Sequence, residues 1–153
     1  MNPQRLIDLA IRPALEMLIP ELHGLLAERL LVAIAVQESG ITHRAQIGGP
    51  ARGWWQFERI GVEGVLRHRK AGPVLSNIAA VLGYPPDAHV LHSAIEHNDL
   101  LAAATARLAL WTDPHPLPGD SANAWACYLR VWRPGHPRPE HWDASWARAM
   151  AIV

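Results

Sequence analysis

Residues 30–58, LLVAIAVQESGITHRAQIGGPARGWWQFE, decide which fold to expect. The stretch opens with an apolar run, Leu30–Val36, that is too short to span a bilayer. Because this run is apolar on every side, it predicts a buried central helix. Glu38 stands where that helix ends, and a loop rich in glycine and proline leads from it to Trp54 and Trp55. A carboxylate in this setting indicates a cleft with a desolvated general acid and aromatic walls.

The composition predicts one globular domain that covers residues 1–153. Half of the residues are hydrophobic and 18% are charged, which excludes a disordered chain. Fourteen basic and 14 acidic residues give a formal net charge of zero. Nucleic-acid binding needs an excess of lysine and arginine, so no nucleic-acid partner is expected. A neutral polymer is a more natural partner than a polyanion.

The rest of the chain predicts further helices, separated by proline and glycine. Asn2 and Ser121 are placed to cap helices, and Pro13 should bend or split the first one. Residues 39–57 predict an irregular loop, because neither the helical nor the strand period is sustained. The expected fold is an all-α domain of seven or eight helices around the buried central one. The expected helices cover about 3–18, 22–38, 57–69, 73–83, 88–97, 98–111, 122–132 and 139–151.

Seven tryptophans against one phenylalanine and two tyrosines is an unusual choice of aromatic residues. Trp111, Trp142 and Trp146 are expected to fill a helical core. Tryptophan also presents an apolar face with a polar edge, which suits the stacking of sugar rings. A single cysteine, Cys127, forbids an internal disulfide.

Glu38 has two interpretations. A carboxylate buried without a partner has a raised pKa, which suits a general acid near neutral pH. The alternative is a structural ion pair at the end of the helix, with Arg44 or Arg52 as the cation. The residues alone leave both open.

Three short blocks resemble one enzyme family. Glu38-Ser39 and then Gly53-Trp54-Trp55-Gln56 are similar to the E-S … G-L-M-Q pattern of lytic transglycosylases and goose-type lysozymes. Ala126-Cys127-Tyr128 lies where that family has an A-Y-N segment, whose tyrosine approaches the catalytic glutamate. The resemblance covers roughly residues 30–132. It implies a lysozyme-like, lytic-transglycosylase-type helical domain.

The resemblance also implies roles for individual residues. Glu38 would be the catalytic acid and then the base, Tyr128 would orient it by a hydrogen bond, and Gln56 would contact the substrate's acetamido or neighbouring groups. The chain departs from the family in having Trp54-Trp55 for Leu-Met and Leu129 for the asparagine of A-Y-N. The predicted substrate-binding residues are Ser39, Arg44, Gly53, Trp54, Trp55, Gln56 and Trp132.

Glu58 is the candidate for a second carboxylate. Glycosidases with two carboxylates hydrolyse the bond with an activated water or a covalent intermediate. If Glu58 instead faces solvent at the start of the next helix, Glu38 works alone. The family's single-glutamate chemistry then applies, in which the 2-acetamido group assists and the sugar's 6-hydroxyl attacks to form a 1,6-anhydro product.

The function implied by the resemblance is cleavage of the β-1,4 bond between MurNAc and GlcNAc in peptidoglycan glycan strands. The alternative is a virion or cell-wall-binding structural protein that keeps the fold with little or no catalysis. The loop sequence QIGGPARGWWQFE, followed later by WRPGHP, also resembles small lysozyme-like proteins of tailed phages, so other virion proteins are further candidate partners.

The remaining expectations concern cofactors and location. His89, His92 and Glu96 share one face of a predicted helix, but surface histidines are the more natural interpretation than a metal site. No metal and no cofactor are expected. The N-terminus does not resemble a signal peptide and no segment suits membrane insertion, so we expect a virion-associated protein or one made in the host cytoplasm and delivered to the wall.

Overall fold

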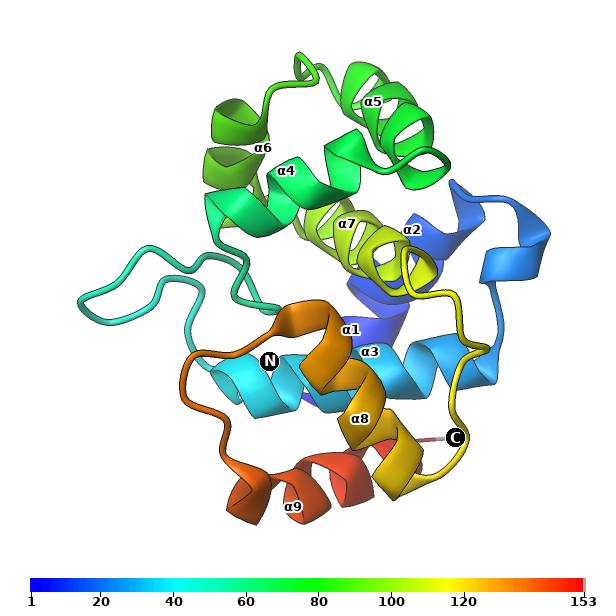
Figure 1. Cartoon of the computed structure of the whole chain (residues 1–153), viewed down its shortest axis with the longest axis vertical. Helices are drawn as coiled ribbons and strands as arrows, with labels where there is room; N and C mark the ends of the chain where they lie inside the picture. The colour runs from blue at the N-terminus through cyan, green and yellow to red at the C-terminus, as the bar shows by residue number, and fades with distance from the viewer. Residues whose placement is uncertain (153) are drawn as a thin grey trace.

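Helix α3 (Leu25–Ser39) runs through the middle of the molecule in the computed structural model, which describes residues 1–152 (Figure 1). Every side chain from Leu30 to Ala35 is fully buried, which confirms the predicted central helix. The helix begins at Leu25 rather than near residue 22, because Pro20–Leu22 form a separate 3-10 turn, η2.

The first helical segment is continuous but changes type along its length. It consists of α1 (Pro3–Leu6), the π-helical turn η1 (Ile7–Ile11) and α2 (Arg12–Glu16). Asn2 caps it as predicted, since its side chain accepts a hydrogen bond from a first-turn amide. Pro13 does not split the helix. Instead, the wider π turn directly precedes it, which is the kind of local adjustment that accompanies an interrupted hydrogen-bond ladder.

The later helices follow the predicted order. They are α4 (Arg59–Arg67), α5 (Ala71–Val81), α6 (Ala88–Ile95), α7 (Asp99–Trp111), α8 (Ser121–Trp132) and α9 (Pro139–Met150). With α1, η1 and α2 taken as one helix, residues 1–152 contain eight α-helices, and the all-α prediction is confirmed. The predicted cap of α8 was wrong by one residue, because Asp120 rather than Ser121 accepts the hydrogen bond from the Asn123 amide at 2.9 Å.

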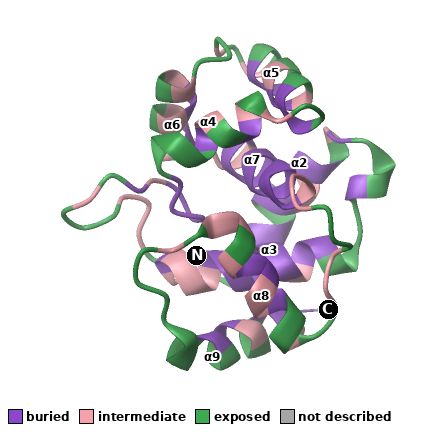
Figure 2. Cartoon of the chain, in the orientation of Figure 1, coloured by how far each residue is buried: buried purple, intermediate pink, exposed green. Residues whose placement is uncertain are grey.

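The helices form two groups with α7 between them. Helix α3 packs against α9 and α7, and α8 also contacts α9. On the other side, α4 packs on α5 and α6, and all three pack on α7 (Figure 1). Figure 2 shows α3 and α7 as the most buried helices. Although α3 and α7 are apolar, no helix within residues 1–152 is long and apolar enough to cross a membrane.

The segment between α3 and α4 is irregular, as predicted. Gly40 ends α3 in the left-handed conformation, and its amide donates to the Val36 carbonyl. Two isolated antiparallel bridges, Ala45 to Arg52 and Arg52 to Phe57, hold the segment together. They fold it back over α3, so that Trp54 and Trp55 reach the core.

Candidate active site

Glu38 and Tyr128 meet at the end of α3. Glu38 lies in the last turn of the helix and is half-buried. The Tyr128 hydroxyl, 90 residues further along the chain on α8, donates a hydrogen bond to Glu38 Oε1 at 2.5 Å. The contact that the family resemblance implies is therefore present in this fold.

Burial raises the pKa of Glu38 to about 7. The hydrogen bond from Tyr128 stabilises the carboxylate and acts in the opposite direction, whereas the negative charge of Glu58 raises the pKa further. The C-terminal end of a helix also disfavours an anion, because its unpaired carbonyls carry partial negative charge. A carboxyl group in this setting can hold a proton near neutral pH and release it again, as a general acid and base must.

Glu38 does not form the structural ion pair with Arg44 or Arg52 that was the alternative prediction. The Arg44 guanidinium forms a two-pronged pair with the Asp99 carboxylate, with Nη2 2.9 Å from Oδ2. Arg52 lies 3.6 Å from Glu96. Within residues 1–152, therefore, no cation pairs with this half-buried carboxyl group, and the hydrogen bond from Tyr128 is what stabilises its charge.

An aromatic cluster on α8 and α9 fixes Tyr128. Its ring stacks on Trp142 with centroids 5.7 Å apart and planes at 14°, and it also contacts Trp125 and Trp132 at 5.3 and 6.4 Å. Burial, together with the neighbouring carboxylate, raises the pKa of the Tyr128 hydroxyl. The hydroxyl therefore stays protonated and remains a donor to Glu38.

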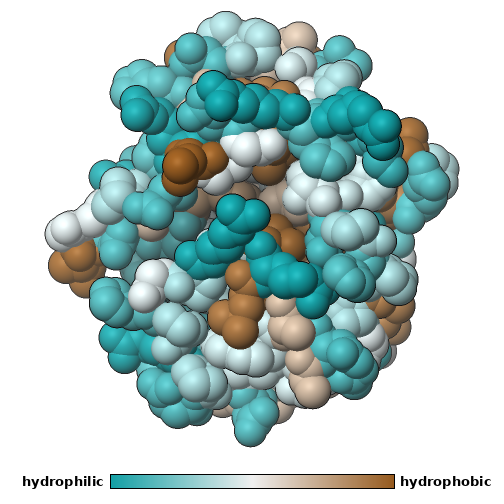
Figure 3. Space-filling model, viewed as in Figure 1, coloured by the Kyte–Doolittle hydropathy of each residue, from teal (hydrophilic) through white to brown (hydrophobic). Residues whose placement is uncertain are grey.

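A groove of about 380 Å³ lies beside this pair, between α4 and the ends of α7 and α8. Glu38 and Tyr128 are not among its lining residues, but Glu58 and Trp132, which interact with them, are. Figure 3 shows this face hollowed across its middle, with hydrophilic and hydrophobic side chains side by side. The lining residues are Gln56, Phe57, Glu58, Ile60, Gly61, Gly64, Val65, Ala109, Thr112, Val131, Trp132 and Arg133.

Glu58 occupies the N-cap position of α4, although its side chain makes no capping hydrogen bond. It is exposed, it lines the groove, and no cation within residues 1–152 pairs with it. Burial is the main cause of the raised pKa of Glu38, and the negative charge of Glu58 adds to it. Glu58 thus faces the groove instead of supporting the helix.

Contrary to the prediction, neither Trp54 nor Trp55 forms a wall of the cleft. Trp55 is fully buried, and its Nε1 donates to the Leu31 carbonyl at 2.8 Å. Trp54 is 5% exposed and lies beneath the Arg44 guanidinium, 4.2 Å from the ring centroid. Both rings anchor the loop to the protein core and have no free face for a ligand, and the guanidinium of Arg44 is engaged by Asp99.

Ser39 and Gly53 are likewise structural, contrary to the prediction that they bind substrate. Ser39 is buried, and its hydroxyl lies 2.7 Å from the Trp54 carbonyl and accepts from the Ile41 amide at 3.1 Å. Gly53 has a φ of +77°, and a Cβ there would lie 2.9 Å from the Ile95 carbonyl oxygen. Both residues therefore shape the loop that carries Gln56 and Glu58.

Gln56 and Trp132 do reach the groove. Gln56 has a φ of +51°, and its side-chain amide donates to the Gly53 carbonyl at 2.9 Å, so it is held rigidly. Trp132 donates from Nε1 to the Trp55 carbonyl at 2.9 Å, and its ring lies against Phe57 at 5.6 Å. These two residues and Phe57 form one wall of the groove, and Trp132 connects it to Tyr128.

No protein-family model, curated protein or solved structure matches the chain. The choice of a function therefore rests on the site.

The sequence did not indicate the far wall of the groove, which α4 forms. Ile60 is 76% exposed there, and Gly61 and Gly64 stand beside it. The spacing of the two glycines is the signal that could have indicated this wall, because residues three apart share one face of a helix and glycine leaves that face open. Arg133, in the left-handed conformation at the end of α8, is the cation of the groove's rim.

In the histidine cluster, His92 and Glu96 make structural contacts. His92 Nε2 lies 2.9 Å from the carbonyl oxygens of Pro50 and Phe57, and so ties α6 to the loop. Glu96 is shared between Arg52 and His97. Among residues 1–152, no three potential ligands come together in a way that could hold a metal ion.

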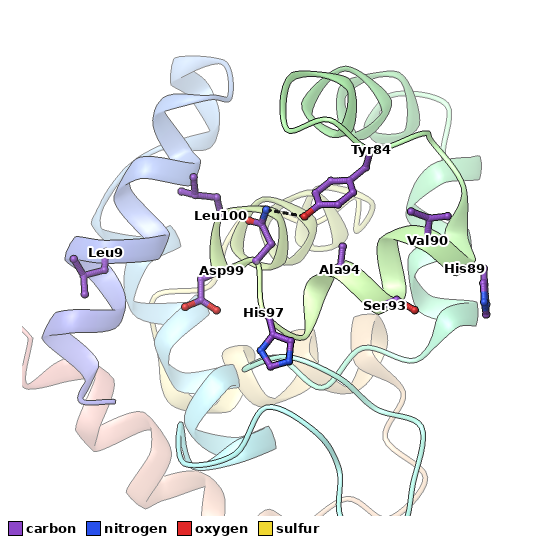
Figure 4. Close-up of a pocket in the computed structure, with 10 residues that line it drawn as sticks. Leu9, Tyr84, His89, Val90, Ser93, Ala94, His97, Asp99 and Leu100 are labelled. Atoms are coloured by element: carbon purple, nitrogen blue, oxygen red, sulfur yellow. Dashed lines mark hydrogen bonds between the residues drawn. The ribbon is translucent and has the colours of Figure 1, made fainter.

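A larger pocket, about 730 Å³, lies elsewhere, between η1, α6 and the start of α7. Figure 4 shows Tyr84, His97 and Asp99 around it, with a hydrogen bond from Asn98 to the Tyr84 hydroxyl. Asp99 is already paired with Arg44. This pocket contains neither Glu38 nor Glu58, so size alone does not mark the candidate site.

Proposed function

We propose that this protein is a peptidoglycan-degrading glycosidase of lysozyme-like fold, which cleaves the β-1,4 bond between MurNAc and GlcNAc. Glu38 is its general acid and base. One observation carries the proposal: a half-buried, unpaired carboxyl group at the end of a buried helix, with a pKa raised to about 7 and one oxygen held by Tyr128. The family resemblance in the Glu38, Gln56 and Tyr128 blocks supports it.

The chemistry follows from the proton on Glu38. The neutral acid donates its proton to the glycosidic oxygen as the bond breaks, and the carboxylate that remains accepts a proton from the attacking group. The groove supports a sugar chain as ligand, because it combines an aromatic wall at Trp132 and Phe57 with the polar groups of Gln56 and Glu58.

The decisive test is clearing of a purified cell-wall suspension by the intact protein and by Glu38→Gln. The amide keeps the shape of the side chain and can accept the Tyr128 hydrogen bond, but it cannot donate a proton from a carboxyl group. Loss of a general acid typically costs about 10²–10⁴-fold in rate. Glu16→Gln, at an exposed glutamate, is the matched control and should clear the suspension normally. If Glu38→Gln still clears the suspension, Glu38 is not the general acid and the mechanism is wrong.

A second experiment separates the two reaction types. Mass analysis of the released fragments distinguishes reducing ends, which hydrolysis forms, from 1,6-anhydro ends. If Glu58 is the second carboxylate, Glu58→Gln abolishes clearing and the wild-type products carry reducing ends. If Glu38 works alone, Glu58→Gln remains active and the products carry anhydro ends.

The second candidate function is wall binding without catalysis. It is favoured by Leu129, which replaces the asparagine of the family's A-Y-N segment and packs partly against the core. Co-sedimentation with cell walls tests it directly. Binding without clearing, unchanged in Glu38→Gln, would favour this function over the enzyme.

A further inference from the structure

Arg107 is a buried cation in the apolar helix α7. The residue is only 4% exposed, and its Nε donates a hydrogen bond to the Leu22 carbonyl at 2.8 Å. Burial lowers the pKa of the Arg107 guanidinium to about 10, which leaves it charged at neutral pH. A buried charge is costly unless a partner compensates it, so the surroundings of Arg107 need an explanation.

The neighbouring acidic groups do not compensate Arg107. The Asp113 carboxylate is bonded to Arg130 at 2.9 Å and to His115 at 3.1 Å. Burial raises the pKa of the Cys127 thiol to about 11, so the thiol is neutral. Across residues 1–152, no carboxylate forms an ion pair with Arg107.

The guanidinium lines a cavity of about 460 Å³. In the described part of the chain, the buried side-chain nitrogens without a partner are Arg29 Nε and Trp54 Nε1. The terminal nitrogens of Arg107 are not among them, no hydrogen bond within residues 1–152 engages them, and Arg107 lines this cavity. Its lining residues come from η2, the start of α3, the end of α7 and the segment after it, which lie on one side of the molecule in Figure 1.

We propose that this cavity, the Arg107 pocket, binds a single carboxylate group carried on an apolar body. Leu26, Trp111 and Leu117 supply apolar walls beside the guanidinium. One uncompensated cation matches one negative charge, and the guanidinium fork suits the two oxygens of a carboxylate. Glu21 and Asp113, also in the lining, repel a dianion such as phosphate more strongly than a single carboxylate. The proposal does not depend on the reaction at Glu38.

The test is an NMR titration of the full-length protein that follows the Arg107 Nε–H and Trp111 indole signals. The probes are isovalerate, its uncharged isostere isovaleramide, N-acetylleucine and inorganic phosphate. Saturable shifts with isovalerate or N-acetylleucine, and at least about tenfold weaker binding of isovaleramide, are expected from the loss of a charge-assisted hydrogen bond. The tighter of the two carboxylates shows whether the natural ligand is a free acid or the C-terminus of a peptide.

A matched pair of variants locates the site. Leu26 and Leu25 are neighbours in the first turn of α3, 48% and 45% exposed, but only Leu26 lines the pocket. A glutamate is favourable in the first turn of a helix, so both variants should fold. Leu26→Glu places a competing carboxylate at the pocket and should weaken isovalerate binding about fivefold, whereas Leu25→Glu should leave it unchanged. Arg107→Met removes the cation and should abolish binding in the folded protein.

Several results would overturn the proposal. These are the absence of saturable binding of both carboxylates, equal binding of isovaleramide, or tighter binding of phosphate than of either carboxylate. Equal affinities of Leu26→Glu and Leu25→Glu would do the same. If Arg107→Met does not fold, the comparison of the two glutamate variants decides.

Discussion

The Tyr128 hydroxyl donates to Glu38 Oε1 at 2.5 Å, and this hydrogen bond joins α8 to the end of α3. Stacking on Trp142 fixes the tyrosine, so the bond holds one carboxyl oxygen in a defined place. The other oxygen, Oε2, has no hydrogen-bond partner within residues 1–152. In the proposed reaction this second oxygen carries the proton, while Tyr128 acts as a positioning residue.

Tyr128→Phe should raise the pKa of Glu38 above its wild-type value of about 7, because the lost hydrogen bond stabilises the charged form. The phenyl ring keeps the stacking, so the free energy of unfolding should fall by only about 1 kcal/mol. Carbon-13 NMR titration of the Glu38 carboxyl group measures the pKa. Tyr84→Phe, which loses a hydroxyl bonded to Asn98, is the control and should leave the pKa of Glu38 unchanged. A lower pKa in Tyr128→Phe would contradict the assignment.

Glu58→Gln should shift the pKa of Glu38 in the opposite direction. The negative charge of Glu58 raises the pKa of Glu38, so its removal should lower that pKa. The same carboxyl titration tests this, at low ionic strength because salt screens exposed charges. Glu63→Gln, at the α4 glutamate that pairs with Arg67, serves as the control. An unchanged pKa in Glu58→Gln would mean that the two carboxylates do not interact across the groove.

Protonation of Glu38 should also govern how stability depends on pH. The pKa of Glu38 is raised from 4.5 to about 7 on folding, so folding favours the protonated form. The contribution of Glu38 to the free energy of unfolding is judged against a residue that cannot titrate. This contribution is complete below pH 4.5 and is lost as the pH rises through about 7. The shift corresponds to about 3 kcal/mol.

Glu38→Gln should therefore be as stable as the wild type near pH 4, and more stable by up to about 3 kcal/mol at pH 8. Urea unfolding of both proteins at the two pH values measures the difference. Glu16→Gln should show no such dependence on pH, because that side chain is exposed. A wild type that gained stability relative to Glu38→Gln as the pH rises would show that Glu38 is compensated in the folded state.

Much of the fold could be predicted from the sequence, because periodicity and caps are local signals. The apolar run gave α3, and Asn2, Asp87 and Asn98 cap the helices that follow them. Glu38 stood out because a lone carboxylate at the end of a buried run is unusual. Tyr128 was reached only through the family resemblance, because its hydrogen bond to Glu38 joins residues 90 positions apart in the sequence.

Whether the Trp54 and Trp55 side chains point into the core or into the cleft could not be predicted, since side chains in an irregular loop follow no fixed period. Trp54 and Trp55 turn inward because Ser39 and Arg44 hold the loop onto α3 and α7. For Arg107, the signal was present as one arginine in the run LAAATARLALW. Only the packing of η2 and the segment after α7 shows that a cavity lies beside it.

Gly53 is closely packed against the backbone of α6, and its substitution tests how the loop supports the groove. Gly53→Ala meets two penalties, a φ of +77° and a Cβ placed 2.8 Å from Ile95 Cγ2 and 2.9 Å from the Ile95 carbonyl oxygen. Gly48→Ala meets only the first, because Gly48 has a φ of +71° with open space around it. Gly48→Ala should cost about 1 kcal/mol, and Gly53→Ala at least about 2 kcal/mol more.

The difference between the two variants isolates the clash with α6, because the backbone strain is common to both. The free energy of unfolding from urea denaturation measures it. Since Gly53 also accepts the side-chain hydrogen bond of Gln56, Gly53→Ala should displace Gln56 and Glu58 and lower wall clearing more than Gly48→Ala does. Equal unfolding free energies for the two variants would show that the loop moves away from α6 at no cost. In that case the groove wall at Gln56 would not depend on the close approach of Gly53 to Ile95.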